Sequence, residues 1–70
     1  MSYRDEPGQL TPRMRDVLRA AARGASSRET ALELHVSEHT VQHLRAAAST
    51  RLEARNITAA VAIAVSRGEL

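Results

Sequence analysis

The sequence predicts an all-α domain built from four short helices, and three observations support this fold class. The chain has 70 residues and no cysteine, which limits it to one small domain without a disulfide or a thiolate metal site. Alanine is its commonest apolar residue, and it has a single tyrosine and no tryptophan or phenylalanine, which favours closely packed helices over sheets. Four capping signals each precede a stretch with helical periodicity.

The first two helices have clear start signals. Thr11 can cap a helix that begins at Pro12 and ends at Gly24, which suits the left-handed position after a helix. Ser26 and Glu29 can form a capping box for the second helix. The expected inward residues of the first helix are Met14, Val17, Leu18, Ala21 and Ala22. The second helix is expected to end near Leu34, and with the following turn it directs Ala31, Leu34 and Val36 into the core.

The third and fourth helices follow the same rules. Ser37 can cap a helix that covers roughly residues 38–52, and Thr58 can cap another over roughly residues 59–67, with 53–57 as the connection. The inward face of the third helix is expected to hold Val41, Leu44, Ala48 and Leu52. In the fourth helix, the residues expected to face the core are Val61 and Val65.

Residues 26–34 and 38–52 form a pair of helices joined by a short turn. This length and capping pattern is typical of a helix-turn-helix, although an antiparallel helical hairpin fits the same pattern.

The chain is expected to consist of a flexible tail, residues 1–9, and one domain, residues 10–70. The longest apolar stretch, Ala59 to Val65, is far shorter than the roughly 20 residues that span a bilayer. The polar N-terminus does not resemble a signal peptide, so a cytoplasmic protein with no membrane partner is expected. The ends at Met1 and Leu70 fit either a whole gene product or an excised domain.

The basic residues are all arginine. Ten arginines against eight acidic residues give a net charge of +2, which is too small to predict nucleic-acid binding alone. Arg15, Arg19 and Arg23 would form a stripe along one face of the first helix, and a solvated surface is the simplest interpretation of it.

Taken together in order, many residues of the segment from Leu10 to Leu70 resemble the LuxR/GerE-type DNA-binding domain. The resemblance implies a four-helix domain of bacterial or phage origin, in which the second and third helices bind DNA and the fourth often pairs two copies. The matching positions are Leu10-Thr11, Arg13, Val17-Leu18, Ala22, Gly24, Ser26, Glu29, Ser37, Thr40-Val41, Leu52, Arg55-Asn56, Thr58, Ala60-Val61, Ala64 and Gly68.

The third helix departs from the family pattern. Gln42 replaces the usual lysine, Leu44 and Arg45 replace a histidine and a valine, and Ala48 replaces an isoleucine. Because an unpaired buried charge is costly, we expect the helix to be rotated or shifted so that Leu44 points inward and Arg45 reaches outward. A one-residue realignment that places His43 on the family's histidine is also compatible with the sequence.

The resemblance implies a set of DNA contacts, and for each of these residues an ordinary exposed surface role is the alternative. Base contacts are expected from Gln42, His43, Ala46 and His39, where glutamine can pair with adenine and alanine can touch a thymine methyl. Phosphate contacts are expected from Ser37, Thr40, Arg28, Arg45, Arg51 and Arg55.

The fourth helix is apolar on every side, whereas a monomer can bury only one side. The remainder is expected to pair two copies as a weak dimer or one formed on DNA, and the alternative is an alanine surface that stays monomeric. The expected interface residues are Ile57, Ala59, Ala62 and Ile63.

No metal site, cofactor or enzymatic activity is expected. His35, His39 and His43 lie at suggestive spacing, but no cysteine supports them and the turn after His35 interrupts the register. The sequence holds no recognisable set of nucleophile, base and orienting group.

Two functions follow from these observations. The first is a sequence-specific regulator of transcription that binds double-stranded DNA as a homodimer, with residues 38–52 in the major groove. The second is an interaction protein that forms a heterodimer with another LuxR-type regulator and antagonises its dimerisation or DNA binding. The loss of the usual lysine at Gln42 favours the second function.

Overall fold

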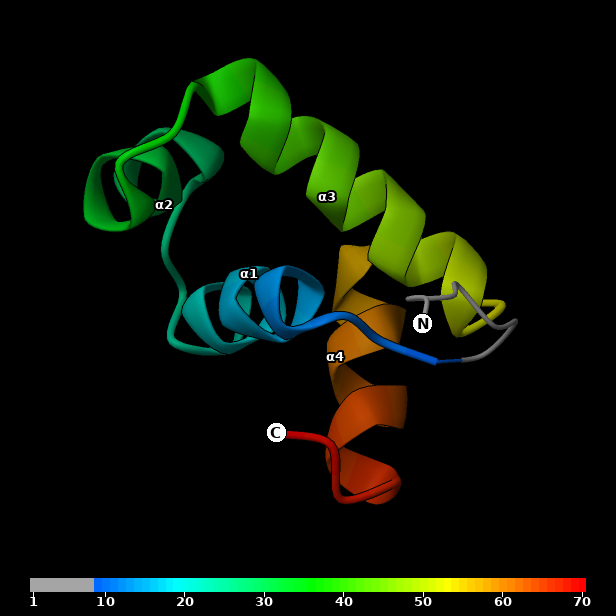
Figure 1. Cartoon of the computed structure of the whole chain (residues 1–70). Coiled ribbons are helices and arrows are strands. Elements are labelled where there is room, and N and C mark those ends of the chain that lie inside the picture. The colour runs from blue at the N-terminus through cyan, green and yellow to red at the C-terminus, as the bar shows by residue number, and fades with distance from the viewer. Residues whose placement is uncertain (1–8) are drawn as a thin grey trace, which may run out of the picture.

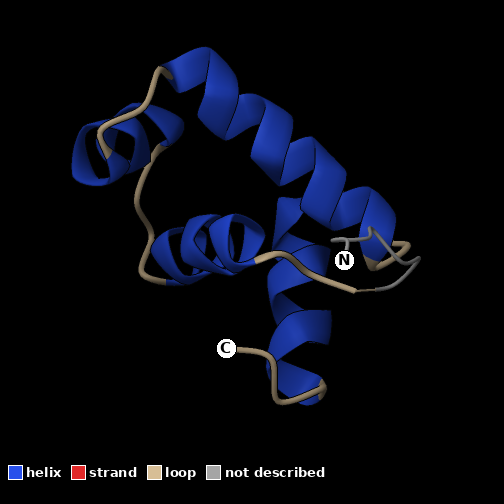
Figure 2. Cartoon of the chain, viewed as in Figure 1, coloured by secondary structure: helices blue, strands red, loops and turns tan. Residues whose placement is uncertain are grey.

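The computed structural model describes residues 9–70 and shows four helices joined by short loops (Figure 1). They are α1 (Pro12–Ala22), α2 (Ser27–Leu34), α3 (Glu38–Arg51) and α4 (Ile57–Ser66). No strand occurs between residues 9 and 70 (Figure 2), and the predicted all-α fold is confirmed. The predicted tail lies outside the described residues except for Gln9.

The caps predicted for α1, α2 and α3 are confirmed. In each, the side-chain oxygen accepts a hydrogen bond from the backbone amide three residues later, which gives that amide a partner that the helix cannot supply. In α2 the Ser26 amide also donates to Glu29 Oε1 at 2.8 Å, which completes the capping box. The cap distances are 3.2 Å from Met14 to Thr11, 3.0 Å from Glu29 to Ser26 and 3.0 Å from Thr40 to Ser37.

The start predicted for α4 is wrong by two residues. Asn56, not Thr58, is the cap, and its Oδ1 accepts a hydrogen bond from the Ala59 amide at 2.8 Å. Asparagine is at least as good a cap as threonine, and its extended backbone here directs the side chain toward the free amides. Ile57 therefore belongs to the helix rather than to the connection.

The core consists of two clusters, and α1 packs against all three other helices. The smaller cluster joins α1, α2 and α3 through Val17, Ala31 and Val41, with Leu34 and Val36 packed against it. The larger cluster lies where α1, α3 and α4 meet. Its buried members are Leu10, Met14, Leu18, Ala48, Leu52, Ala60 and Ala64.

Several predicted inward positions differ from the structure. In α1, Ala20 is buried whereas Ala22 is exposed and Ala21 is half-buried. In α4, Ala60 and Ala64 face the core, while Val61 is half-buried and Val65 is 58% exposed. Alanines at these contact points have little bulk, so α4 can approach α1 and α3 closely, with Val61 packed at the edge of the larger cluster and Val65 outside it.

Among residues 9–70, two residues other than glycine adopt a left-handed backbone. His35 has a φ of 59° at the end of α2, and Glu53 has a φ of 56° just after α3. A side chain in this conformation crowds the following carbonyl oxygen, which glycine avoids. Both residues redirect the chain sharply, the first into α3 and the second toward α4.

Candidate nucleic-acid interface

The turn between α2 and α3 gives the two helices different directions. His35 closes α2 in its left-handed conformation, Val36 packs against the smaller core cluster and Ser37 caps α3. Figure 1 shows α2 and α3 crossing rather than lying antiparallel side by side. The arrangement is that of a helix-turn-helix, which excludes the antiparallel hairpin.

One side of α3 faces solvent and is here called the reading face. It consists of His39, Gln42, His43, Ala46 and Thr50, which are all exposed and recur at intervals of three and four residues. The rings of His39 and His43 lie with their centroids 5.0 Å apart. The structure thus gathers all four predicted base-contact residues on one surface, and it adds Thr50, which the sequence analysis did not single out.

Two residues of α3 that depart from the family pattern, Leu44 and Arg45, lie away from the reading face. Leu44 is half-buried and packs against both core clusters, as expected. Arg45 does not extend freely into solvent. It is half-buried on the flank of the helix, where its Nη1 donates a hydrogen bond to Ser27 Oγ at 3.1 Å.

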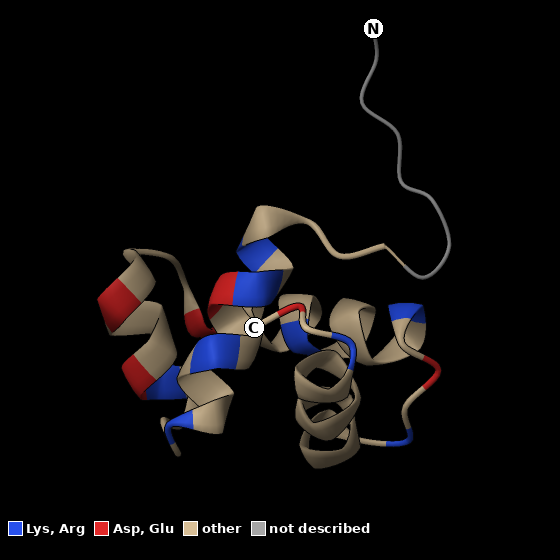
Figure 3. Ribbon diagram, turned by 90° about the horizontal axis from the view of Figure 1, so that it is seen from below, with Lys and Arg blue, Asp and Glu red and all other residues tan. Residues whose placement is uncertain are grey.

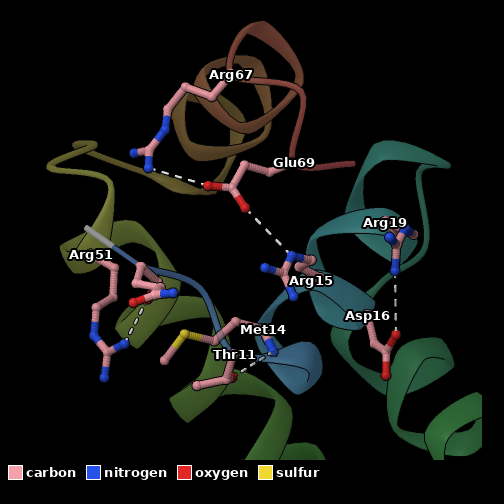
Figure 4. A network of polar contacts seen from close by, with 9 residues as sticks. Thr11, Met14, Arg15, Asp16, Arg19, Arg51, Arg67 and Glu69 are labelled. Carbon is pink, nitrogen blue, oxygen red and sulfur yellow. Dashed lines mark hydrogen bonds and ion pairs between the residues drawn. The ribbon is translucent and has the colours of Figure 1, made fainter. Parts of the chain in front are cut away.

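The residues predicted to contact phosphate come from α2, from α3 and its cap, and from the connection after α3. The Ser37 hydroxyl donates to Thr40 Oγ1 at 2.9 Å at the start of α3. Arg28 in the first turn of α2 and Arg55 in the α3–α4 connection are exposed, with no hydrogen bond or ion pair to any residue between 9 and 70. Arg51 differs from them, because its Nη1 donates to the Gln9 carbonyl oxygen at 2.7 Å (Figure 4) and so ties α3 to the segment before α1.

Three arginines in or just after α1, Arg15, Arg19 and Arg23, are paired with acidic residues, whereas Arg13 at the start of α1 is exposed. Arg23 donates two hydrogen bonds to Glu33, at 2.7 and 2.8 Å, and Arg19 lies 3.6 Å from Asp16. Figure 4 shows Glu69 between Arg15, at 3.4 Å, and Arg67, at 3.2 Å. The predicted stripe is therefore largely neutralised, while α4 is uncharged (Figure 3).

Comparison with known sequences agrees with this geometry. The sequence model of the family described as "Bacterial regulatory proteins, luxR family" matches residues 8–64. The chain belongs to this family. The resemblance drawn from the sequence is confirmed, and the match covers the helix-turn-helix and most of α4.

A relative supports the same assignment for this luxR-family domain. The chain is 38% identical over 65 residues to a Bacillus subtilis (strain 168) protein named "Uncharacterized transcriptional regulatory protein YvfU". The alignment covers 93% of this chain and 32% of the relative, so the chain spans about a third of the relative's length.

The α4 helix of this luxR-family domain presents a narrow exposed strip made of Thr58, Ala62, Val65 and Ser66. Of the predicted interface residues, Ala62 alone is exposed. Ile57 and Ile63 are half-buried against the larger core cluster, and Ala59 is half-buried. The strip is rotated from the predicted interface because α4 starts at Ile57 and presents its alanines to the core.

Two kinds of feature, a cluster of metal-ligating side chains and a helix that could span a membrane, do not occur in residues 9–70. Residues 9–70 contain no group of three or more histidine, cysteine, aspartate or glutamate side chains placed to hold a metal ion. None of the helices in this part of the chain has the length and apolar character needed to cross a membrane.

Proposed function

We propose that this chain is a sequence-specific regulator of transcription, in which residues 10–70 form the domain that binds double-stranded DNA. The observation that carries the proposal is the reading face. In this luxR-family helix-turn-helix, four potential base-contact residues are exposed along one side of α3. DNA as the partner implies that the protein acts in the cytoplasm of a bacterium or of a phage-infected cell.

The proposed base contacts follow from the chemistry of each side chain. Gln42 can accept from and donate to adenine at once, which is worth roughly 1–3 kcal/mol of discrimination. His39 and His43 can each donate or accept at a base edge, and the Ala46 methyl suits a thymine methyl. Together they cover successive turns of α3, which suits a short half-site.

Contacts with the DNA phosphates would hold α3 in the major groove. Arg28 and Arg55 contribute from neighbouring elements, and the amides at the start of α3, near Ser37 and Thr40, favour an anion.

Dimerisation through α4 is part of the proposal. Ala62 and Val65 lie on the exposed strip, while Ile57, Ala59 and Ile63 border it with part of their surface. The apolar area of these side chains is small, so we propose a homodimer that forms on a two-fold DNA site.

The test is a selection from random duplex DNA with the purified chain at two salt concentrations. A two-fold motif that is bound far more tightly than bulk DNA is the expected result, with affinity falling as salt rises. A matched variant with Gln42→Ala and His43→Ala should lose the motif but keep the weak binding. If the native chain enriches no motif, this proposal is wrong.

A second candidate function is an antagonist that pairs through α4 with another luxR-family regulator. The uncharged α4 strip and the neutral Gln42 on the reading face favour it. It predicts no enriched DNA motif and a stable heterodimer with such a regulator, which sedimentation of the mixed proteins would detect.

A further inference from the structure

A hollow of about 370 Å³ lies where the end of α1 and the turn after it meet the middle of α3 and the start of α4. It is here called the α1–α4 hollow. Its volume is at the small end of the roughly 300–1,000 Å³ that small-molecule sites usually have. None of the reading-face residues lines it, so it is a separate feature of the domain.

Most of the lining of the α1–α4 hollow is apolar. Ala21 of α1 and Ala25 of the following turn contribute on one helix, and Ile57 and Val61 contribute from α4. All four residues are half-buried, so each leaves part of its apolar surface in water. An aliphatic group of a ligand would be stabilised by covering this surface.

The polar side chains of the lining are Arg45 and Thr58. Arg45 is half-buried, and the one hydrogen-bond partner of its guanidinium among residues 9–70 is the neutral Ser27 hydroxyl, at 3.1 Å. The Thr58 hydroxyl forms no hydrogen bond with residues 9–70, and no carboxylate lines the hollow. Because a partly desolvated guanidinium without a counter-charge is unfavourable, the hollow favours an anion.

The balance of charge narrows the chemistry of that anion. A single guanidinium matches a single negative charge, which favours a carboxylate over a phosphate monoester, whose charge at neutral pH is about −1.5 to −2. Arg45 can donate to both oxygens of a carboxylate, and Thr58 can donate its hydroxyl proton to one of them.

We infer that the α1–α4 hollow binds a small aliphatic monocarboxylate. Its carboxylate pairs with Arg45, and its hydrocarbon chain covers Ile57 and Val61. A ligand held in this way connects α1, α3 and α4, and it therefore stabilises the folded domain. The site goes beyond the proposed function and does not depend on DNA binding.

A nuclear magnetic resonance titration of the ¹⁵N-labelled native chain with hexanoate tests the site. Saturable shifts are expected for the amide signals of Ala25, Arg45, Thr58 and their neighbours. Acetate has the charge without the chain, and hexanol has the chain without the charge. Each should bind at least about tenfold more weakly than hexanoate, and inorganic phosphate should also bind more weakly.

Three variants connect the shifts to the hollow. Arg45→Gln should reduce the affinity for hexanoate to that for hexanol, and Thr58→Val should weaken hexanoate binding several-fold. Arg55→Gln is the matched control, because it removes an exposed arginine that does not line the hollow, and it should keep the native affinity. Circular dichroism melts confirm that the variants fold, and exposed Thr58 keeps the test decisive if Arg45→Gln unfolds.

Three results would overturn the inferred site. They are shifts that do not saturate, acetate or phosphate binding as tight as hexanoate binding, and native hexanoate affinity in a folded Arg45→Gln or in Thr58→Val. Because the titration contains no DNA, none of these results alters the proposed function.

Discussion

Three single residues stand out in this domain: Gln42 and Arg45 for their polar chemistry on α3, and Glu53 for its strained backbone. Gln42 stands at the centre of the reading face, and its amide can pair with a base in a way that a lysine cannot. Arg45 occupies the flank of the same helix, where Ser27 holds it without neutralising it. Glu53, a residue with a bulky side chain, occupies a backbone conformation that suits glycine.

Gln42→Ala should remove discrimination at one base pair of the selected site. The variant should lose roughly 1–3 kcal/mol of binding free energy on the selected DNA site. It should lose little on a duplex in which that base pair has already been changed. Gln9→Ala is a matched control, because it makes the same change at an exposed residue outside the reading face. Anisotropy titrations on both duplexes measure the effect, and equal losses on the two would rule out a base contact.

Glu53→Gly should stabilise the fold. Glycine relieves the crowding at a φ of 56° but gains more freedom in the unfolded chain, so the expected net gain is roughly 0.5–1 kcal/mol. Thermal unfolding should shift upward by several degrees. Glu53→Ala, which keeps a Cβ atom in the strained conformation, should give no comparable rise, and an equal rise would show that charge rather than strain is responsible.

At the scale of elements, helix starts are set by local hydrogen bonds, whereas helix faces are set by the neighbours. The capping oxygens of α1, α2 and α3 lie within three residues of their donors, so their positions follow from short motifs. In α4 nearly every residue is apolar, so periodicity does not single out an inward face. Packing of Ala60 and Ala64 against the larger core cluster decides it.

The corrected start of α4 can be measured directly. Asn56→Ala should destabilise the domain by about 1 kcal/mol, because the Ala59 amide loses its partner. Thr58→Ala should leave stability almost unchanged, since Thr58 is exposed inside the helix and is not its cap. Urea denaturation of the two variants compares them, and the reverse order would restore Thr58 as the cap.

At the scale of the whole molecule, some arginines are paired with carboxylates and others are not. Glu69 joins Arg15 of α1 to Arg67 after α4, and Glu33 pairs with Arg23, so acidic residues neutralise most of the arginine charge near α1, although Arg13 lacks such a partner among residues 9–70. Arg28 in α2, Arg45 in α3 and Arg55 after α3 also have no carboxylate partner in this part of the chain. A net charge of +2 conceals this asymmetry, although it is the property that would attract DNA.

Assembly through α4 is testable with the two large apolar side chains that the described residues expose. Val65, 58% exposed on α4, and Leu32, 72% exposed on α2, lie on different helices. Val65→Glu should abolish the two-to-one protein–DNA complex by placing charges in the paired surface, while Leu32→Glu should leave it intact. Analytical ultracentrifugation of each complex gives the stoichiometry, and an unchanged value for Val65→Glu would exclude pairing through this strip.

Much of the fold could be predicted from short-range patterns. The all-α class, the caps of α1 to α3, the left-handed closure after α1 at Gly24 and the alignment of Val41, Leu44, Ala48 and Leu52 depend on residues within one or two helical turns of each other. The four reading-face residues His39, Gln42, His43 and Ala46 could also be found, because the same spacing that directs the apolar residues inward directs these outward. Thr50 continues that spacing four residues after Ala46.

What the sequence by itself determined is the number of helices, most of their boundaries and the face of α3 that meets solvent, since local hydrogen bonds and periodicity control these. The tertiary structure alone decided the rest. The bond from Arg45 to Ser27 spans 18 residues, a hollow is lined jointly by α3 and the connection after it, and the exposed strip of α4 depends on which alanines meet the core. Such features depend on how helices pack in space, and an alanine-rich sequence permits several packings of similar hydrophobicity.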